Sequence, residues 1–457
     1  MTEVVRVEAA RVEVLTAADA ELAQARMAGA MVSGGLTAGD RVVFCLPSSG
    51  RLLCAVLGAL RVGIVPVLVN ATLLDTERDL LIADVQPAMS VLDDETLDLL
   101  DAGSPIDRAP RPMARPMYFT SGTTGRAKGV WSGIWDERDS AAALADEADQ
   151  WGFGPDDVHL VCSPMYHSVS IRFAGGTLLA GGTCVILPHF DADMAAGALE
   201  GRFGPVPTTT FLAPSALTRL LAMDDNGPER FSRLRLMVHA GSPCPPALKR
   251  AAFDVVGPGV LWEFYGATEG QFTVCSPTEW AERPGTVGRA RSGRTLAVDD
   301  DGTVWCRPPD FSRFAYWGDE DKSSAAWRDG WFTVGDLGRL DADGYLYLDG
   351  RRDDLIITGG VNVYPAEVEA SLSNVHGVEE VAVFGLTDER WGQQVCVAVV
   401  ITAEGDAKAV IDALRRHAVD HLAGYKRPKR YEVVEDLPRT ATGKVRRLAL
   451  PEALSLE

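Results

Sequence analysis

The sequence predicts an α/β protein with a large N-terminal body of parallel-rich sheets flanked by helices, followed by a smaller C-terminal α+β cap domain. Three observations support this fold class. The chain has 457 residues, and at roughly 150 residues per domain this length favours two to four domains. From about Asp40 to Phe264, short apolar runs alternate with helical patterns, which is typical of βαβ units. After Arg351 the order of the patterns changes, which indicates a separate domain.

The alternating runs define the expected elements of the body. In its first part they are Arg41–Leu46, Leu52–Leu60, Val65–Val69, Leu80–Ala83 and Met89–Leu92. They continue through Val158–Cys162, Thr183–Leu187, Thr209–Leu212, Leu234–His239 and Gly259–Phe264, with helices such as Pro214–Ala222 between them. The long apolar stretch from Leu52 to Val69 contains Arg61, Gly63 and Pro66. We interpret it as a helix followed by a buried strand, because a membrane span needs about 20 uninterrupted apolar residues.

Short hairpins are expected towards the end of the body. Thr295–Arg307 reads as one, and Asp343–Gly344 lies between alternating apolar residues, which is a strong hairpin signal. These hairpins are expected to form a small β-barrel-like part of the body, which we place at residues 1–350.

The C-terminal domain, residues 355–457, mixes helices with strands. Pro365 can open a helix, since proline is favoured at the first helical position. The other expected elements are the strands Val378–Gly385, Val395–Ile401 and Arg430–Val434 and the amphipathic helix Ala409–Leu422.

Composition and charge limit the partners of the chain. Hydrophobic residues make up 46% and charged residues 24%, as in an ordinary globular protein. Asp and Glu number 64 against 44 Lys and Arg, so the formal net charge is -20. Such a deficit of cations argues against nucleic acid as a partner. The N-terminal residues contain acids and no sustained apolar run, so we expect no signal peptide, no membrane partner and a cytoplasmic location.

The first segment that indicates a chemistry is MYFTSGTTGRAKGV, residues 117–130. Glycines allow backbone N–H groups to converge on one point, hydroxyls add donors and a lysine adds a cation, a set that suits a polyphosphate. The spacing differs from that of a Walker A loop. The residues assigned to phosphate binding are Thr120, Ser121, Gly122, Thr123, Thr124, Gly125 and Lys128.

This segment resembles the phosphate-binding signature of the adenylate-forming superfamily, which contains acyl- and aryl-CoA synthetases, adenylation domains of peptide synthetases and beetle luciferases. Further segments resemble the family in the same order, from about Asp40 to Leu448. They are HAGSPCP at 239–245, EFYGATEG at 263–270, GWFTVGDLGRLDADGYLYLDGRRDD at 330–354 and LPRTATGKVRRLAL at 437–450. The chain is most similar to acyl- and aryl-CoA ligases, although its N-terminal part is shorter than in typical members.

The resemblance implies a nucleotide site at the ends of two strands and in the hinge region. Its residues there are Gly241, Ser242 and Pro243 along the adenine, Tyr265 stacked on it, Gly266 and Ala267, Thr268 at the α-phosphate, Glu269 at Mg²⁺, and Asp336 and Arg351 at the ribose. An aromatic face, a hydroxyl and a hard oxygen ligand are the groups that a metal nucleotide requires. Val334 replaces the threonine that usually precedes Gly-Asp in the family, and the carboxylate of Asp336 is retained.

The resemblance also implies that the C-terminal domain is a mobile cap. Asp353 lies in the implied hinge, residues 351–354, about which the cap rotates between two catalytic poses. Gly359 and Gly360 line the implied thiol channel, and Lys444 is the implied adenylating lysine. A lysine beside the attacked phosphate stabilises charge that grows in the transition state.

The implied acyl pocket is centred on SPMYHSVSIRF, residues 163–173. His167 is the candidate for contacting the substrate carboxylate and admitting the thiol; the alternative is a histidine satisfied at a helix start. The residues implied to line the pocket are Tyr166, His167, Ser168, Phe211, Phe264, Gly266 and Gly270. Peptide-synthetase domains have an aspartate near this gate, which pairs with the α-amino group of the substrate. The segment Tyr166–Phe173 contains no aspartate and has Arg172 instead, which argues against an amino-acid substrate.

The resulting hypothesis is an ATP- and Mg²⁺-dependent acid–thiol ligase that forms an acyl- or aryl-adenylate and then a CoA thioester, with Lys444, Glu269, Thr268 and His167 as catalytic residues. Three alternatives share the first step: loading of a carrier-protein phosphopantetheine, amide formation, and activation of nitrite to diazotise an aryl amine in secondary metabolism. A fourth is a nucleotide-binding protein without catalysis. The expected partners are a small carboxylic acid, ATP, CoA or a carrier protein, and a second copy of the chain.

Overall fold

The computed structural model describes residues 12–120, 128–223, 227–257, 259–358, 361–388, 390–403, 405–439 and 445–456, and for Asp353 and Asn362 the backbone alone. The chain divides into two compact units. Unit 1 comprises Met1–Leu296 and Cys306–Phe332, and unit 2 comprises Ala297–Trp305 and Thr333–Glu457. The predicted body, hinge and cap boundaries stay predictions, because a compact unit is not by itself a moving domain.

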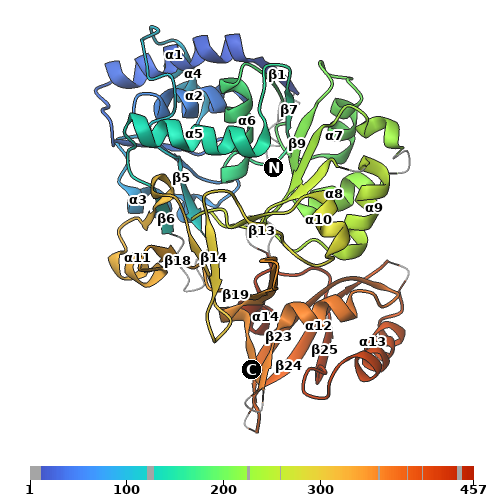
Figure 1. Ribbon diagram of the computed structural model, residues 1–457. Helices are drawn as coiled ribbons and strands as arrows, with labels where there is room; N and C mark the ends of the chain where they lie inside the picture. Colours follow the sequence, from blue (N-terminus) through green and yellow to red (C-terminus); the bar gives the residue numbers. More distant parts are fainter. Residues whose placement is uncertain are drawn as a thin grey trace, which may run out of the picture. The chain divides into compact units, whose positions relative to one another are not determined.

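Unit 1 alternates strands with helices (Figure 1). Its helices are α1 (Ala17–Ser33), α2 (Gly50–Leu60), α3 (Asp75–Val85), α4 (Asp94–Asp101), α5 (Glu137–Trp151), α6 (Ser168–Leu179), α7 (Ala192–Leu199), α8 (Pro214–Leu221), α9 (Pro246–Val256), α10 (Pro277–Glu282), α11 (Glu320–Ala326) and the 3₁₀ turns η1 (Pro228–Phe231) and η2 (Asp310–Ser312). Its longer strands are β1 (Glu13–Thr16), β2 (Arg41–Phe44), β3 (Val65–Leu68), β4 (Met89–Val91), β5 (Met117–Thr120), β6 (Lys128–Trp131), β7 (Val158–Val161), β8 (Thr183–Ile186), β9 (Thr209–Leu212), β10 (Leu236–His239) and β11 (Leu261–Glu263). Short strands follow: β12 (Thr273–Val274), β13 (Arg289–Ala290), β16 (Ala315–Tyr316), β17 (Trp327–Arg328) and β18 (Trp331–Phe332), while β14 (Thr295–Val298) and β15 (Val304–Arg307) contain the residues where the chain passes between the units.

Two parallel-rich sheets organise unit 1. The first has the strand order β1-β8-β7-β9-β10-β11, with all pairs parallel except β1 with β8. The second has the order β16-β6-β5-β3-β2-β4, in which β2, β3, β4 and β5 are parallel, β6 pairs antiparallel with β5, and β16 pairs antiparallel with β6. Strands such as β2, β3 and β9 are almost entirely buried, because helices cover both faces of a parallel sheet.

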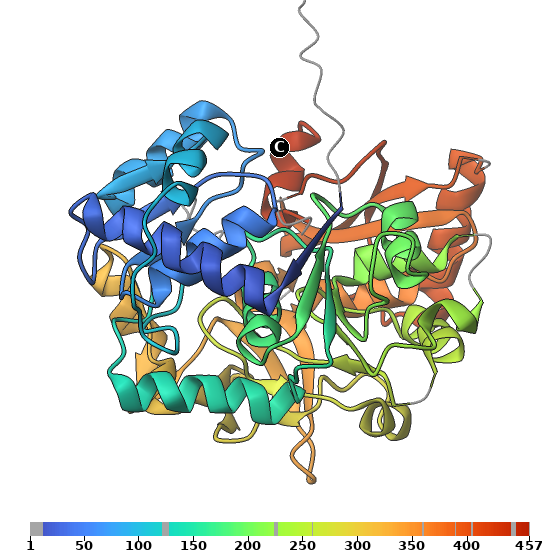
Figure 2. The same ribbon diagram turned by 90° about the horizontal axis from the view of Figure 1, so that it is seen from above.

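Helices pack between and around these sheets (Figures 1 and 2). The largest core cluster combines residues of both sheets with residues of α1, α2 and α6. Helix α2 is buried almost all round, and the Ser49 hydroxyl caps it by accepting a hydrogen bond from the Leu52 N–H at 3.1 Å. A second core cluster joins α7, α8 and α9 to the first sheet. A third cluster is aromatic and lies between α5, α6 and the strands β9 and β10.

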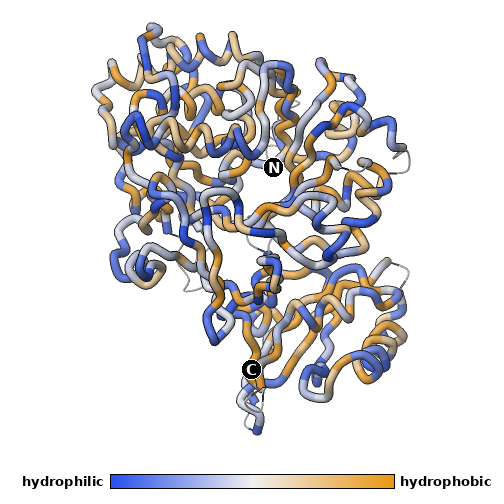
Figure 3. Tube along the Cα trace, viewed as in Figure 1, coloured by the Kyte–Doolittle hydropathy of each residue, from blue (hydrophilic) through white to orange (hydrophobic). Residues whose placement is uncertain are grey.

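Unit 2 contains a hairpin and a mixed sheet. Its elements are β19 (Asp336–Leu340), β20 (Leu346–Arg351), η3 (Arg352–Asp354), β21 (Ile356–Thr358), β22 (Val361–Val363), α12 (Pro365–Leu372), β23 (Val378–Asp388), β24 (Gly392–Ile401), α13 (Ala407–His421), β25 (Arg430–Val433), η4 (Arg447–Ala449) and α14 (Leu450–Ala453). The strands β19 and β20 form the antiparallel hairpin expected at Asp343–Gly344, where Gly344 has φ +82. In Figure 3 the hydrophobic colours follow the strands of the mixed sheet, and α13 carries both colours, as an amphipathic helix does.

The predicted fold class is confirmed: parallel-rich sheets with flanking helices form the body, and a domain of mixed helices and strands follows. The expected runs correspond to β2, α2, β3, α3 and β4 in the first part of the chain. Among the described residues, the structure contains no helix with the length and apolarity that a membrane crossing requires.

Candidate active site

Three neighbouring parallel strands of the first sheet end at the same edge. His239 of β10 pairs with Leu212 of β9 and with Glu263 of β11, so the segments that follow these three residues start side by side. Ligands of open α/β sheets bind outside the carboxyl ends of the strands. The two motif segments HAGSPCP and EFYGATEG therefore begin where the fold places ligand sites.

The predicted phosphate loop connects two antiparallel strands of the second sheet. Thr120 ends β5 and pairs with Lys128, the first residue of β6. The Lys128 Nζ lies 3.5 Å from Oδ2 of Asp319, which caps the N-terminus of α11. The other predicted phosphate-binding residues, Ser121, Gly122, Thr123, Thr124 and Gly125, lie outside the described residues. The structure thus places the two flanking residues of the loop opposite each other.

A tight turn presents Thr268 and Glu269. Ala267 and Gly270 exchange two backbone hydrogen bonds, at 2.9 and 3.2 Å, and Gly266 bridges Gln271. A Cβ atom on Gly266 would lie 2.7 Å from the Gln271 Cα and from the Gly270 carbonyl oxygen, so this turn requires glycine. The predicted catalytic pair is therefore held at the tip of a short, closed loop.

Glu269 is a buried carboxylate with a defined partner. The Tyr316 hydroxyl donates a hydrogen bond to Glu269 Oε1 at 2.7 Å, and Glu269 is 5% exposed. Tyr316 lies on β16, and the Lys322 ammonium stands 4.1 Å from the centre of its ring. A carboxylate fixed on one oxygen fits Mg²⁺, which takes oxygen ligands and is usually bound through one or two carboxylates plus substrate phosphates. Sequence reasoning missed Tyr316, because it lies 47 residues away along the chain in a strand without a motif.

The predicted adenine side combines an exposed loop with a partly buried aromatic residue. Gly241, Ser242 and Pro243 are exposed, and Gly241 has φ +95, a conformation that favours glycine. The ring of Tyr265 packs on the buried Phe272, with 4.9 Å between the ring centres. The loop and Tyr265 follow the adjacent strands β10 and β11, as the sequence predicted.

The predicted acyl side is split between two core clusters. Phe211 and Phe264 come together, with 6.2 Å between ring centres, in the aromatic cluster with Trp151 and Phe173. Tyr166 packs against the core between the sheets, and its ring centre is 4.4 Å from that of His167. His167 is the N-cap residue of α6, and its side chain makes no capping hydrogen bond. Ser168 is the first residue of the same helix. A Cβ atom on Gly270 would lie 2.8 Å from the ring of Phe332.

An arginine-rich network, which we call the arginine network, lies beside this cluster. Its members are Arg172, Arg291, Arg294, Asp146, Glu147 and Gln271. Arg172 donates to Glu147 Oε2 at 3.0 Å and to Gln271 Oε1 at 2.9 Å. Burial alone would raise the pKa of Glu147, but Arg172 and then Arg291 lower it to about 2. Sequence reasoning noted Arg172 only as a departure from the peptide-synthetase pattern and missed the network, whose members are up to 148 residues apart.

A buried ion pair supports the strands that precede the adenine side. The Lys249 ammonium of α9 donates to Glu263 at the end of β11, and the two residues are 1% and 7% exposed. Burial raises the pKa of Glu263 and opposes the effect of Lys249. The pair therefore connects α9 to β11, the strand that immediately precedes Phe264 and Tyr265.

Unit 2 brings together the two residues assigned to the ribose. Asp336 and Arg351 face each other across the hairpin of β19 and β20, and Arg351 Nε lies 3.1 Å from Asp336 Oδ1. Asp336 is buried at 8% exposure, whereas the Arg351 side chain is 40% exposed. Gly359, Gly360 and Lys444 lie outside the described residues, as does the side chain of Asp353.

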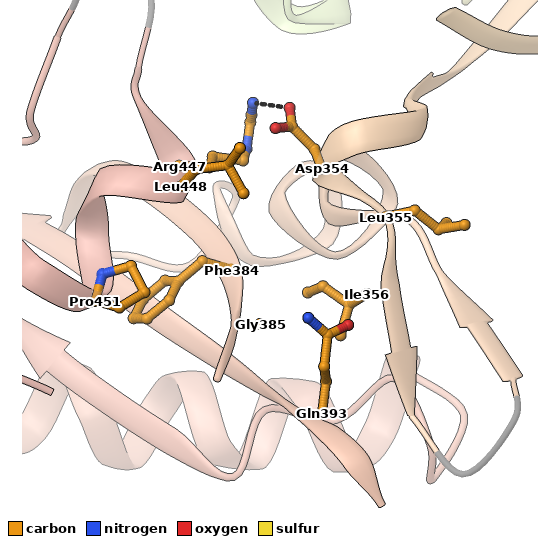
Figure 4. A pocket seen from close by; sticks show the side chains of 9 residues that line it. All are labelled: Asp354, Leu355, Ile356, Phe384, Gly385, Gln393, Arg447, Leu448 and Pro451. Carbon is orange, nitrogen blue, oxygen red and sulfur yellow. Dashed lines mark hydrogen bonds and ion pairs between the residues drawn. The ribbon is translucent and has the colours of Figure 1, made fainter. Parts of the chain in front are cut away.

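A small cavity of ≈ 60 Å³ lies within unit 2 (Figure 4). Arg447, on its rim, forms ion pairs with Asp354 at 3.2 Å and with Glu369 at 2.7 Å. The residues that line the cavity are Asp354, Leu355, Ile356, Phe384, Gly385, Gln393, Arg447, Leu448 and Pro451. None of these residues was predicted to bind a ligand, and the ion pairs of Arg447 connect the C-terminal segment to α12 and η3.

The chain matches two family models that together span most of its length. Residues 2–310 match the family described as AMP-binding enzyme, and residues 367–444 match the AMP-binding enzyme C-terminal domain. The chain belongs to the AMP-binding enzyme family, which confirms the predicted membership in the adenylate-forming superfamily.

Relatives and solved structures agree with this assignment. Indoleacetate–CoA ligase of Aromatoleum aromaticum is 35% identical over 75% of this chain and 68% of that protein. 2-Succinylbenzoate–CoA ligase of Bacillus pumilus is 33% identical over 72% of this chain and 67% of that protein. The structure of O-succinylbenzoate coenzyme A synthetase of Bacillus subtilis with ATP and magnesium has 25% identity and a TM-score of 0.82, covering 95% of this chain and 94% of that one.

These similarities confirm the predicted enzyme class. The chain is an AMP-forming acid–thiol ligase, and ATP, Mg²⁺ and CoA are the cofactor and substrates of this class. The roles of the individual site residues are proposals, and they follow.

Proposed function

We propose that the chain activates an aromatic carboxylic acid as its adenylate and transfers the acyl group to CoA. A carboxylate oxygen of the acid attacks the α-phosphorus of ATP, and pyrophosphate leaves with the electrons of the broken phosphorus–oxygen bond. The CoA sulfur then attacks the acyl carbon, its proton is lost to solvent, and AMP leaves. The protein contributes position and charge to both steps.

One observation supports this proposal: two successive aromatic residues, which precede the turn of Thr268 and Glu269, pack on different groups. Tyr265 and Phe264 are successive residues, and their rings pack on different groups, on Phe272 and on the aromatic cluster respectively. ATP would therefore bind on the Tyr265 side and the acid on the Phe264 side, with the Thr268 hydroxyl and the Glu269 carboxylate at the reacting groups.

The remaining residues have roles around this turn. The phosphates would be held by Thr120 to Gly125 and Lys128. The adenine would lie against Gly241, Ser242 and Pro243, and the ribose would bind to Asp336 and Arg351. Glu269, oriented by Tyr316, would bind Mg²⁺, which supplies charge neutralisation at the phosphates. Lys444 would stabilise charge at the attacked phosphate, His167 would meet the substrate carboxylate, and Gly359 and Gly360 would admit the thiol.

The aromatic nature of the acid is inferred from the acid side itself. Phe211, Phe264, Phe173 and Trp151 pack with ring centres 5.1 to 6.2 Å apart. Such rings favour a flat aromatic ligand, since aromatic pairs gain energy beyond their buried area. The two relatives named above are ligases of indoleacetate and of 2-succinylbenzoate, which are also aromatic acids.

Exchange of radiolabelled pyrophosphate into ATP tests the first step. We expect exchange with benzoic, phenylacetic or cinnamic acids, little with short aliphatic acids, and loss of at least about 100-fold in Lys444→Ala, as for removal of a group that stabilises transition-state charge. Aliphatic acids that outperform every aromatic acid would contradict the aromatic assignment. Full exchange activity in Lys444→Ala would contradict the role of the lysine.

Mass spectrometry of the product tests the acceptor. With ATP, the acid and CoA, we expect the acyl-CoA thioester. If CoA yields no thioester, an amide or a loaded carrier protein would identify another acceptor. A diazonium product from nitrite and an aryl amine would instead identify nitrite as the activated group. A cytoplasmic location and a homodimer stay predictions; light scattering of the purified chain measures the oligomeric state.

A further inference from the structure

The turn of Thr268 and Glu269 is the tip of a hairpin. At the base of this hairpin, Glu263 and Cys275 exchange two backbone hydrogen bonds, at 3.0 and 2.8 Å. Gln271 lies on the returning side, two residues after Glu269. A two-stranded hairpin is only marginally stable by itself. The direction in which its tip points therefore depends on contacts with other parts of the chain.

The side chain of Gln271 connects this hairpin to the arginine network. Its Oε1 accepts a hydrogen bond from Arg291 Nη1 at 2.7 Å and another from Arg172 Nη2 at 2.9 Å. Its Nε2 donates to the carbonyl oxygen of Thr273 at 3.0 Å, and the residue is 7% exposed. Hydrogen bonds from guanidinium groups are stronger than those between neutral groups. The carboxamide is therefore held firmly, at both of its polar atoms, beside the turn.

Arg172 connects the same carboxamide to helix α6. It lies in the middle of this helix, whose N-cap residue is His167. Its Nε and Nη2 donate to Glu147 Oε2 at 3.2 and 3.0 Å, and its guanidinium stands 5.4 Å from the centre of the Phe264 ring. A guanidinium fixed by a carboxylate and an aromatic ring can orient a third group, here the carboxamide of Gln271.

The bond between Gln271 and Arg172 thus joins the two elements whose residues are proposed to meet in the reaction. The hairpin carries Thr268 and Glu269, assigned to the α-phosphate and Mg²⁺, and the start of α6 carries His167, assigned to the substrate carboxylate. The adenylate forms when a carboxylate oxygen approaches the α-phosphorus in the correct direction, and a misplacement of about 1 Å can cost about 100-fold in rate. The relative position of hairpin and helix therefore matters for the first step.

We propose that Gln271 is a positioning residue for adenylation, which fixes the turn of Thr268 and Glu269 relative to the start of α6 through its bonds to Arg172 and Arg291. This inference rests on the proposed function and adds a residue to it. Both polar atoms of the Gln271 side chain are engaged within the protein. The residue therefore acts through its neighbours and not by contact with the substrate.

Pyrophosphate exchange of two Gln271 variants tests this role. Gln271→Leu removes the carboxamide, and we expect kcat to fall about 10- to 100-fold with nearly unchanged KM for ATP and for the acid, because orientation is lost and binding is not. Gln271→Glu keeps an acceptor for both arginines and loses only the donor to Thr273, so it should keep most of the wild-type kcat. An unchanged kcat in Gln271→Leu would overturn the proposal. An equal loss in both variants would also overturn it, because the bonds to the arginines would then not be the cause.

Gln24→Leu is the matched control for a loss of stability. Gln24 is 1% exposed, and its Oε1 accepts a hydrogen bond from Arg61 Nη1 at 3.0 Å. We expect Gln24→Leu and Gln271→Leu both to lower the free energy of unfolding, since each leaves a buried guanidinium with one acceptor fewer. Only Gln271→Leu should lower kcat, and an equal fall of kcat in the control would overturn the proposal.

Arg172→Lys keeps the test valid if Gln271→Leu fails to fold. A lysine retains the positive charge beside Glu147, but it lacks the planar fork with which Arg172 reaches Glu147 and Gln271 together. We expect the same fall of kcat as in Gln271→Leu. A wild-type kcat in Arg172→Lys would overturn the proposal.

Amide hydrogen exchange of the full chain separates this inference from the proposed function, because it requires no substrate. Within the hairpin, the Phe272 N–H donates to the Tyr265 carbonyl oxygen at 2.9 Å, and the Gly270 N–H donates to that of Ala267 at 3.2 Å. We expect the amides of residues 264–273 to exchange faster in Gln271→Leu than in the wild type, and no such change in Gln24→Leu.

The two measurements together give distinct outcomes. Faster amide exchange of the hairpin in Gln271→Leu, in a chain that catalyses no pyrophosphate exchange with any acid, would reject the adenylation step and support the connection through Gln271. Pyrophosphate exchange by the wild type, with the hairpin equally protected in wild type and Gln271→Leu, would support the adenylation step and overturn the positioning role.

Discussion

The Tyr316 hydroxyl decides how the Glu269 carboxylate is presented. It holds one carboxylate oxygen at 2.7 Å in a buried setting. A carboxylate with one oxygen fixed can offer the other to a cation in a defined direction, and partners of this kind commonly change metal affinity 10- to 100-fold.

We therefore expect Tyr316→Phe to raise the Mg²⁺ concentration needed for half-maximal pyrophosphate exchange by about tenfold. Saturating Mg²⁺ should restore most of the exchange rate, because the carboxylate itself remains. The measurement is a Mg²⁺ titration of exchange at fixed ATP. An unchanged Mg²⁺ requirement, or a loss of rate that Mg²⁺ does not restore, would contradict the positioning role.

The pair of Lys249 and Glu263 is a second buried interaction of a carboxylate, at the end of β11. Removing one partner of a buried pair costs about 3–5 kcal/mol, whereas replacing both with apolar residues is often neutral. We expect Lys249→Met to lower the free energy of unfolding by an amount in that range, and Lys249→Met combined with Glu263→Leu to recover most of it. Denaturant unfolding followed by tryptophan fluorescence checks this. A double variant less stable than the single variant would show that the ion pair itself is required.

At the scale of elements, the functional groups lie at the ends of regular structure. Parallel strands β9, β10 and β11 end together, and a glycine-dependent turn follows the last of them. The turn is narrow because Gly266 approaches the backbone of Gly270 and Gln271 more closely than a side chain permits.

Gly266→Ala tests the requirement for this turn. The new methyl group would meet the Gln271 Cα and the Gly270 oxygen at 2.7 Å, so the backbone must shift. Overpacking of this kind costs about 1–3 kcal/mol, and we expect exchange activity to fall further than stability because Thr268 and Glu269 move with the turn. Gly154→Ala is the matched control, since a Cβ there meets nothing within 4 Å. Activity of Gly266→Ala equal to that of the control would refute the argument.

At the scale of the whole molecule, the arginine network connects parts of unit 1 that are distant along the chain. Glu147 of α5 binds Arg172 of α6 and Arg291, which follows β13. The network thus joins two helices and the segment beyond the first sheet around one buried carboxylate.

The pH dependence of stability should report this carboxylate. Its pKa is lowered from 4.5 to about 2 in the folded chain, so the stabilisation is fully present above pH 4.5 and is lost as the pH falls towards 2. We expect Glu147→Gln to lower the unfolding free energy of unit 1 by about 3 kcal/mol at pH 7. The difference from the wild type should shrink below pH 4.5, as measured by denaturant unfolding across that range. A difference that stays constant down to pH 3 would contradict the assignment.

Much of the fold and part of the site could be predicted from the sequence. The run predicted as Leu234–His239 is β10, Leu236–His239, and the Asp343–Gly344 turn is the hairpin of β19 and β20. Phe211 and Phe264 were expected in one pocket and do pack together. Tyr166 was expected there as well; it packs on the core between the sheets, and its place in the pocket stays a prediction.

The sequence by itself determined the family of this chain, the alternation of its strands and helices, and the motifs at the strand ends, because these depend on local spacing and on residue types. Only the tertiary structure decided which charges are compensated. The bond of Tyr316 to Glu269, the shared carboxylates of the arginine network and the bond of Arg115 to the Thr268 carbonyl join residues that are remote along the chain. Burial and ion pairing depend on distances in space, and the folded chain sets those distances.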